Sequence, residues 1–209
     1  MSLSDWLLEL FFPRWCCHCG SYGELLCADC FNQIEFSVEI VKTENLDSLS
    51  SLTVFNAIGR DLIHALKYAS VKQVAITCAR MMYLYGKIPE VDILTAVPLH
   101  PHRQAQRGFN QAKEIAIELA RLLKLPYLEI TERVVHTTNL AKVSSRQQRA
   151  KTIQGQFRLG EFDHTLVANK RVLIIDDVWT TGATLQEVAL TIKKLPVVNI
   201  AGFAFAHET

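Results

Sequence analysis

Short apolar runs and amphipathic segments alternate along most of this 209-residue chain. Apolar runs that end at turn-forming residues are typical of buried parallel strands, whereas apolar residues at helical spacing indicate amphipathic helices. The pattern predicts strands at 52–57, 92–97, 133–135, 171–175 and 197–205, and helices at 61–85, 113–124 and 184–194. Because strands and helices alternate, we expect an α/β fold with an open parallel sheet and helices on both faces.

A polar, poorly periodic segment at 37–51 divides the chain into two parts. We therefore expect an N-terminal helix and small module over residues 1–45 and a main domain over residues 46–209. Within the first twelve residues, Trp6, Leu7, Leu10 and Phe11 would form one apolar face of a short helix. The segment is too short and too acidic to span a bilayer, so this face would pack on the main domain or touch a membrane shallowly.

The N-terminal part carries two pairs of closely spaced cysteines. Their spacing is C-x2-C-x7-C-x2-C, formed by Cys16, Cys19, Cys27 and Cys30. Two such pairs can close a tetrahedron of thiolates around a structural Zn²⁺ ion, with no open position for catalysis. Disulfides are the alternative, but they need an oxidising compartment and no secretion signal is visible. We therefore expect a cytoplasmic protein with reduced cysteines and a small zinc-knuckle module.

The segment after the apolar run 172–175 carries the clearest candidate chemistry. Asp176 and Asp177 come first, followed by a loop of small and hydroxyl residues that opens a helix. Free N–H groups and the positive dipole end at a helix start favour a phosphate. The two acids would repel a phosphate, so they suit a ribose diol or a Mg²⁺ ion. The combination describes a ribose 5-phosphate, with the loop residues Val178, Thr180, Thr181, Gly182, Ala183 and Thr184 around it.

The run DDVWTTGATL resembles the signature of type I phosphoribosyltransferases, which bind phosphoribosyl pyrophosphate. The resemblance implies a type I phosphoribosyltransferase-like sheet in the main domain. It also implies that Asp176 and Asp177 are the catalytic pair and hold the ribose 2′- and 3′-hydroxyls, while residues 180–184 wrap the 5′-phosphate. Trp179 lies inside the signature, where it would stack on a base or cover the site.

Basic residues gather in the middle of the chain, although the net formal charge is only +1. Residues 93–160 contain eleven Lys or Arg against four Glu, a local balance of +7. Arg103, Arg107 and Lys113 surround a Gly-Phe-Asn-Gln turn just after the strand at 92–97, which would place a basic loop at the carboxyl edge of the sheet. Such cations suit a pyrophosphate or a nucleic-acid backbone, and the alternative is a solvated helix face.

Taken together, these motifs resemble the ComF/GntX family over residues 13–206. The shared features are the cysteine knuckle, an LKY helix, the run VPxHxxRxxxRGFNQ, a basic stretch ending in Phe, and the DDVxTTGAT signature. The resemblance implies pyrophosphate or nucleic-acid contacts from Lys67, Arg103, Arg107, Gly108, Asn110 and Arg149, with Phe109 and Gln111 also on family positions. Three positions depart from the family: Ala141 stands where Gln is usual, Thr152 where Asn is usual, and His207 where Arg is usual.

The ComF/GntX family is associated with natural transformation, in which it handles single-stranded DNA after uptake. The resemblance therefore implies binding of phosphoribosyl pyrophosphate or a related ribose 5-phosphate with Mg²⁺, binding of single-stranded DNA, and contact with other competence proteins such as helicase or recombination machinery. One alternative is an active phosphoribosyltransferase with an unidentified acceptor. Another is a protein-interaction module gated by the sugar phosphate. Phe109 and Trp179 are the aromatic candidates for stacking on bases.

Overall fold

A computed structural model of the chain describes residues 14–37, 39–68, 71–134 and 155–208. Its centre is a five-stranded sheet of order β1-β2-β7-β6-β3. The strands are β1 (Ile40–Val41), β2 (Ser48–Val54), β3 (Ile93–Ala96), β6 (Arg171–Trp179) and β7 (Asn199–His207). β1 is antiparallel to β2, and the other neighbours are parallel. The predicted open parallel sheet is confirmed, with a short antiparallel strand added at one edge.

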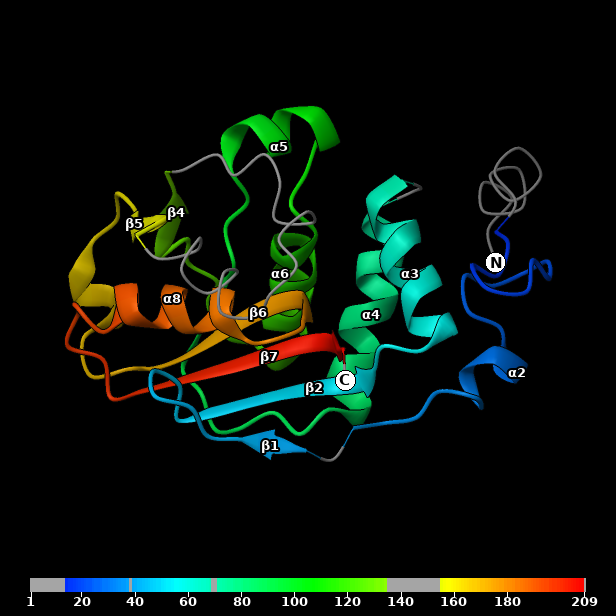
Figure 1. Ribbon diagram of the computed structural model, residues 1–209, viewed down its shortest axis with the longest axis horizontal. Helices are drawn as coiled ribbons and strands as arrows, with labels where there is room; N and C mark the ends of the chain where they lie inside the picture. Colours follow the sequence, from blue (N-terminus) through cyan, green and yellow to red (C-terminus); the bar gives the residue numbers. More distant parts are fainter. Residues whose placement is uncertain (1–13, 38, 69–70, 135–154, 209) are drawn as a thin grey trace.

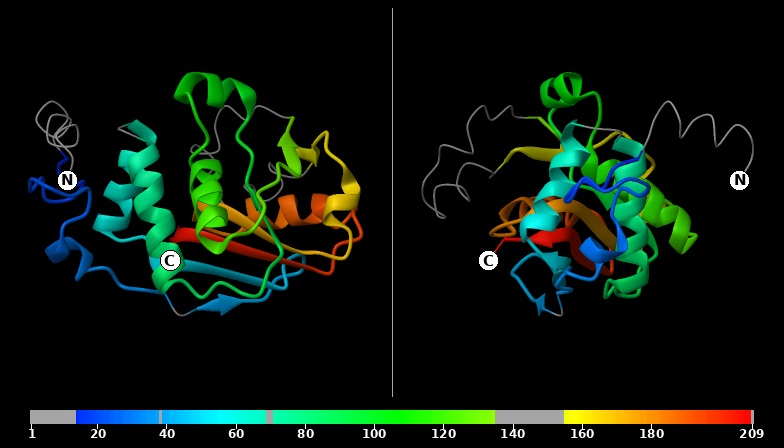
Figure 2. Two further views of the ribbon diagram at one scale, coloured as in Figure 1. Left: turned by 180° about the vertical axis from the view of Figure 1, so that it is seen from behind. Right: turned by 90° about the vertical axis from the view of Figure 1, so that its right-hand side faces the viewer.

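Helices cover both faces of this sheet (Figures 1 and 2). On one face lie α4 (Val71–Tyr85) and α6 (Gln111–Leu123), and on the other lies α8 (Ala183–Ile192). α3 (Ala57–Tyr68) packs against α4 beside the carboxyl ends of the strands. Alternate residues of β6 divide between the two cores: Leu173 and Ile175 pack with the first group, and Val172 and Ile174 pack with α8. This alternation explains why the strand reads as a continuous apolar run, since both of its faces are buried.

The predicted helix at 61–85 is wrong in one respect, because two helices occupy this region. α3 and α4 pack side by side, and Leu62, Leu66, Val74 and Cys78 share one buried cluster. Two shorter helices can pack against each other, so that both apolar stripes are buried in one cluster.

The predicted basic loop after β3 is also corrected, since it contains the helix α5 (Pro101–Arg107). Pro101 stands at the first helical position, and the ring of His100 accepts a hydrogen bond from the backbone N–H of His102 (3.2 Å). Gly108 ends the helix in the left-handed conformation, with φ of 80°. These are ordinary helix start and stop signals.

The remaining described elements are small. β4 (Thr131–Arg133) and β5 (Phe157–Leu159) form an antiparallel pair, and η2 (His164–Val167) is a single 3₁₀ turn. α2 (Ala28–Phe31) belongs to the N-terminal module, which lies beside α3 in the blue part of Figure 1. β2 and β7 both run toward this side of the molecule, so the carboxyl edge of the sheet faces α3 (Figure 1).

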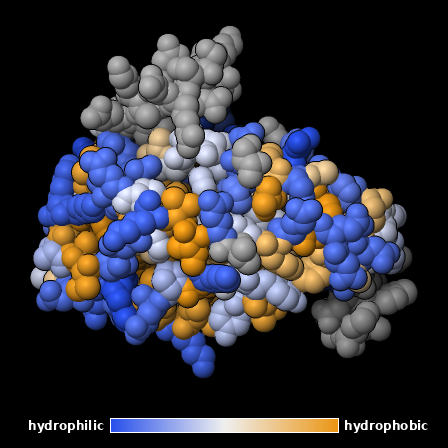
Figure 3. All heavy atoms as spheres, turned by 60° about the horizontal axis from the view of Figure 1, so that its bottom comes forward, coloured by the Kyte–Doolittle hydropathy of each residue, from blue (hydrophilic) through white to orange (hydrophobic). Residues whose placement is uncertain are grey.

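The face shown in Figure 3 carries apolar side chains in several separate patches divided by polar ones. No helix among the described residues is long and apolar enough to cross a membrane.

Candidate functional site

The two signature carboxylates lie inside the last part of β6. The strand pairs with β7 as far as Trp179 and His207, so the predicted strand end at residue 175 is corrected. The backbone N–H of Asp177 donates to Oδ1 of Asp176 (2.9 Å), and that of Val178 donates to Oδ1 of Asp177 (2.9 Å). These bonds fix both carboxylates at the carboxyl edge of the sheet, where open α/β sheets bind ligands.

Asp176 is a buried carboxylate with a displaced pKa. The residue is only 9% exposed. Burial, and then the negative charge of Asp177, raise the pKa of Asp176 well above its ordinary value, while Arg133 of β4 acts in the opposite direction. Burial in turn lowers the pKa of Arg133. A carboxylate held under such conditions is typical of a functional site, because a bound cation or hydroxyl donor would relieve it.

Asp177 is half-buried, and its charge acts on a thiol of α4. The thiol of Cys78, on α4, is fully buried, and burial raises its pKa. The nearby charges of Cys17 and Asp177 raise that pKa further. The second signature acid and Cys17 of the N-terminal module therefore both act electrostatically on this buried thiol of α4.

The loop after the acids turns at Gly182, whose φ is 70°. A Cβ atom at this glycine would lie 2.8 Å from Cδ2 of Leu49 on β2, so a side chain fits neither the backbone conformation nor the space. The backbone N–H of Ala183 donates to Oγ1 of Thr181 (3.3 Å), and α8 begins there. The loop therefore brings threonine hydroxyls and the start of a helix beside the acid pair, an arrangement that suits a phosphate. The predicted loop residues are distributed over the strand end, the turn and the helix start. Val178 lies in β6, Thr180, Thr181 and Gly182 form the turn, and Ala183 and Thr184 begin α8.

Two predicted cations, Arg103 and Arg107, are half-buried on α5. The pKa of Arg133 is lowered first by burial and then by the positive charge of Arg103, so α5 and β4 direct cations toward the region of Asp176. Such a cluster can meet an anion next to the acid pair. Arg149 and the side chain of Lys67 lie outside the described residues.

Asn110 holds the basic segment in place. It begins α6, is 7% exposed, donates from Nδ2 to the carbonyl of Val97 (2.9 Å) and accepts at Oδ1 from the N–H of Lys113 (3.4 Å). Both ends of its amide therefore serve to join the end of β3 to α6. A pocket of about 140 Å³ opens between α5, the start of α6 and β4, lined by Asn110, Tyr127 and Arg133 among others. Sequence reasoning assigned no site role to Tyr127 or Arg133, because nothing local marks that these residues approach the end of β3.

Trp179 packs against the last residue of β7. Its ring stacks on His207 with centroids 5.1 Å apart and planes 20° apart. His207 is 5% exposed, and its Nδ1 shares a hydrogen bond with Oγ of Ser51 (2.7 Å). This packing favours a covering role for Trp179 over stacking on a base. Phe109, the other aromatic candidate, is half-buried.

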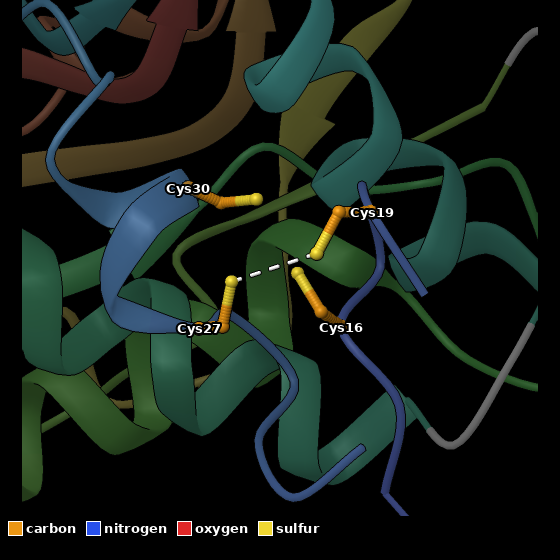
Figure 4. Close-up of side chains that lie close together, drawn as sticks. All are labelled: Cys16, Cys19, Cys27 and Cys30. Carbon is orange, nitrogen blue, oxygen red and sulfur yellow. Dashed lines mark hydrogen bonds between the residues drawn. The ribbon is translucent and has the colours of Figure 1, made fainter. Parts of the chain in front are cut away.

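The four predicted zinc ligands come together in the N-terminal module. Their sulfur atoms lie within 4.8 Å of one another, and those of Cys19 and Cys27 are 3.6 Å apart (Figure 4). A tetrahedral Zn²⁺ with Zn–S distances near 2.3 Å needs sulfur atoms roughly 3.8 Å apart. The cysteines are all free thiols. The cluster is therefore compatible with structural zinc held by Cys16, Cys19, Cys27 and Cys30.

The cysteine cluster is built against the main domain. Cys16 and Cys30 are 3% and 2% exposed, and they belong to the same buried cluster as α3 and α4. Burial opposes ionisation of Cys16, but hydrogen bonds from backbone groups of the module outweigh it and lower the pKa of this thiol to about 6. Nδ1 of His18 lies 2.7 Å from Oδ2 of Asp61 on α3, which adds a polar contact to the apolar one.

This fold, with paired carboxylates followed by a TTGAT turn, defines a phosphoribosyltransferase-type domain. Residues 105–205 match the family model described as "Phosphoribosyl transferase domain".

Similar proteins define the protein's family more narrowly. "Competence protein F" of Haemophilus influenzae is 32% identical and covers 94% of this chain and 85% of its own length. The chain therefore belongs to the ComF/GntX family. "DNA utilization protein YhgH" of Salmonella typhi is 30% identical over 61% of this chain and 58% of its own length. "Competence protein ComFC" of Streptococcus pneumoniae is 30% identical over 53% of this chain and 46% of its own length.

Proposed function

We propose that this chain is a ComF-like competence protein that binds phosphoribosyl pyrophosphate, or a related ribose 5-phosphate, and handles single-stranded DNA during natural transformation. The observation that carries the sugar-phosphate part is the acid pair at the end of β6, of which Asp176 is buried and Asp177 half-buried, beside the Gly182 turn. The carboxylates would bind ribose hydroxyls or Mg²⁺, and the turn would bind a phosphate.

Asp176 and Asp177 supply the chemistry for the ribose end of such a ligand. Carboxylate oxygens accept hydrogen bonds from a diol and are ligands that Mg²⁺ prefers. Bound Mg²⁺ would neutralise the phosphate oxygens of the sugar phosphate. The residues at 178 and 180–184 would hold the 5′-phosphate, and Arg103, Arg107, Gly108, Arg149 and Lys67 would meet pyrophosphate or nucleic acid. Asn110 would position that basic segment.

The DNA and competence part of the proposal rests on the family relationship. Relatives are named for competence and for DNA utilization. Residues 93–160 carry a local balance of +7, which suits a phosphate backbone. In this proposal residues 1–45 form the zinc-finger module, residues 46–209 form the phosphoribosyltransferase-like domain, and the protein acts in the cytoplasm beside helicase or recombination machinery.

The test is calorimetric titration of the zinc-loaded protein with phosphoribosyl pyrophosphate and Mg²⁺. Changing both acids, Asp176→Asn with Asp177→Asn, should weaken binding at least a hundredfold, because two ligand groups are lost together. Asp92→Asn, at the opposite end of β6, is the matched control and should bind as the wild type does. Equal binding by the double variant would remove these residues from the site.

A second measurement separates binding from catalysis. Release of pyrophosphate from the bound ligand, assayed with Mg²⁺ present, would favour an active phosphoribosyltransferase and justify a search for its acceptor. Binding without release would favour a retained binding module. A change in binding to another competence protein when the sugar phosphate is added would favour gating by the ligand.

A further inference from the structure

Two aromatic side chains of the zinc-knuckle module lie on the surface. Trp15 is 54% exposed and Tyr22 is 63% exposed. Their rings meet edge to face, with centroids 5.5 Å apart and planes 72° apart. Neither residue belongs to the buried clusters of the described chain, so the pair is not part of the core. Large aromatic rings exposed side by side are typical of a binding surface.

The backbone holds these two rings in a fixed place. Trp15 and Tyr22 form an antiparallel bridge across the first cysteine turn. The N–H of Cys16 donates to the carbonyl of Ser21 (2.8 Å), and Gly23 donates to Arg14 (2.9 Å). Cys16, the neighbour of Trp15, is buried against the main domain. A ring presented by such a framework loses little freedom on binding a ligand.

The charged residues near the aromatic pair indicate where the phosphates and where the bases of a nucleic acid would bind. Within residues 14–36 there is one arginine, Arg14, against Glu24, Asp29 and Glu35, so the module itself does not attract phosphates. Arg60 and His64 are exposed on α3, next to the Asp61 position that contacts His18 of the module. A strand lying across this junction would place its phosphates toward α3 and its bases toward the aromatic pair.

We infer that Trp15 and Tyr22 form a stacking surface for the unpaired bases of single-stranded DNA. The inference rests on the proposed function for the choice of DNA, and it assigns the base contact to the zinc-knuckle module instead of to Phe109 or Trp179. Every base has an aromatic face, so an aromatic pair binds single strands without selecting a sequence. A duplex hides those faces within its stack.

The test measures binding of a fluorescein-labelled dT20 oligonucleotide by anisotropy. The variant Trp15→Ser with Tyr22→Ser should lower affinity roughly tenfold to a hundredfold, because stacking on two bases is lost. Trp15→Phe with Tyr22→Phe keeps two rings and should bind within about threefold of the wild type. Tyr83→Ser removes another exposed aromatic, 44% exposed on α4, and should leave the affinity unchanged.

Two further readouts separate stacking from a general loss of structure. On an abasic oligonucleotide of the same length, the serine variant and the wild type should bind equally. The slope of log affinity against log salt should also stay the same in the serine variant, whereas Arg60→Gln should lower its magnitude by about 0.7. One zinc per chain and an unaltered melting temperature would show that the module is intact.

The possible failures are distinguishable. If the wild type binds no oligonucleotide, the DNA part of the proposed function fails. If it binds, but the serine variant binds dT20 equally well, only the aromatic surface is overturned. An unchanged DNA affinity together with a change in sedimentation would assign the pair to a contact between chains and would likewise overturn the inference.

Discussion

The two ends of β6 hold carboxylates in opposite circumstances. At the start of the strand, Arg171 donates from Nε and Nη2 to the two oxygens of Asp92 (3.0 and 2.8 Å), and its backbone N–H donates to the same carboxylate (2.8 Å). These bonds hold the pKa of Asp92 well below its usual range. At the other end, Asp176 is buried beside Asp177, and its pKa is raised.

This difference separates the end of the strand that serves stability from the end that we propose as a ligand site. Asp92 has a cation with matching geometry, whereas Asp176 has, among the described residues, one backbone donor and no cation within hydrogen-bond distance. Burying a carboxylate without a neighbouring cation is unfavourable, so such a group often marks a site that another molecule completes. We therefore propose the ligand site at the end of β6 where, among the described residues, the buried carboxylate has no cation within hydrogen-bond distance.

The largest expected effect comes from Asp176→Asn, and it has two opposite parts. Affinity for phosphoribosyl pyrophosphate with Mg²⁺ should fall at least tenfold, because a charged oxygen ligand is replaced by an amide. Thermal stability at neutral pH should rise by roughly 1–2 kcal/mol, because a buried carboxylate beside a second negative charge is removed. Calorimetric titration measures the first part, and thermal melting without ligand measures the second.

Asp176→Asn has a size-matched counterpart at the other end of the strand. Asp92→Asn should leave ligand affinity unchanged and should lower stability. If both variants moved stability in the same direction, the contrast between the two ends of β6 would be wrong.

Gly182→Ala should have the next largest effect. The added Cβ meets Leu49 and requires a positive φ, so we expect a loss of roughly 1–3 kcal/mol in stability and weaker phosphate binding. Adding Leu49→Ala to this variant relieves the contact but not the backbone strain. Chemical denaturation and ligand titration of the wild type, the single variant and the double variant would separate the steric contact from the backbone strain. A Gly182→Ala protein with normal stability and binding would contradict the tight turn.

A change of pH should have a smaller effect on ligand affinity and on stability. Ligand binding needs ionised Asp176, so affinity should increase as pH rises through its elevated pKa. Its contribution to stability has the opposite sign. A group whose folded pKa is raised favours the folded state below its unfolded pKa, near 3.9, and that contribution disappears as pH rises through the folded pKa. Titrations across this range with wild type and Asp176→Asn test both signs, since the variant should show neither trend at this position.

Much of the fold is predictable from sequence because its strongest signals are local. The apolar run at 172–175 predicts a strand buried on both faces, and the cysteine spacing predicts a cluster that the structure assembles. The extension of β6 to Trp179 was not predictable, because it depends on pairing with β7. The division of residues 61–85 into two helices likewise depends on packing between α3 and α4.

Less of the candidate site was predictable, because its geometry depends on contacts distant in sequence. The acids and the TTGAT turn are contiguous, so a motif identifies them. Arg133 acts on Asp176 from a separate small sheet, and no local pattern indicates this. Asn110 sits in a family motif, but only the structure shows that its amide joins Val97 to Lys113. The exposure of Trp15 and Tyr22 also follows from tertiary packing.

The smallest expected effect is on thermal stability, at the start of β6, where Asp92 is paired with Arg171. Asp92→Asn should lower the melting temperature by at most about 2–4 °C, because the ion pair with Arg171 is partly exposed and screened by solvent. The depressed pKa of Asp92 contributes stability above its unfolded pKa, and this contribution is lost as pH falls through the folded value. The difference between wild type and variant should therefore shrink in acid. Glu90→Gln should have less effect still, since its side chain is 84% exposed. Melting curves at neutral and acid pH would test this order. A gap that widened in acid would show that the Asp92 carboxylate does not stabilise the fold through Arg171.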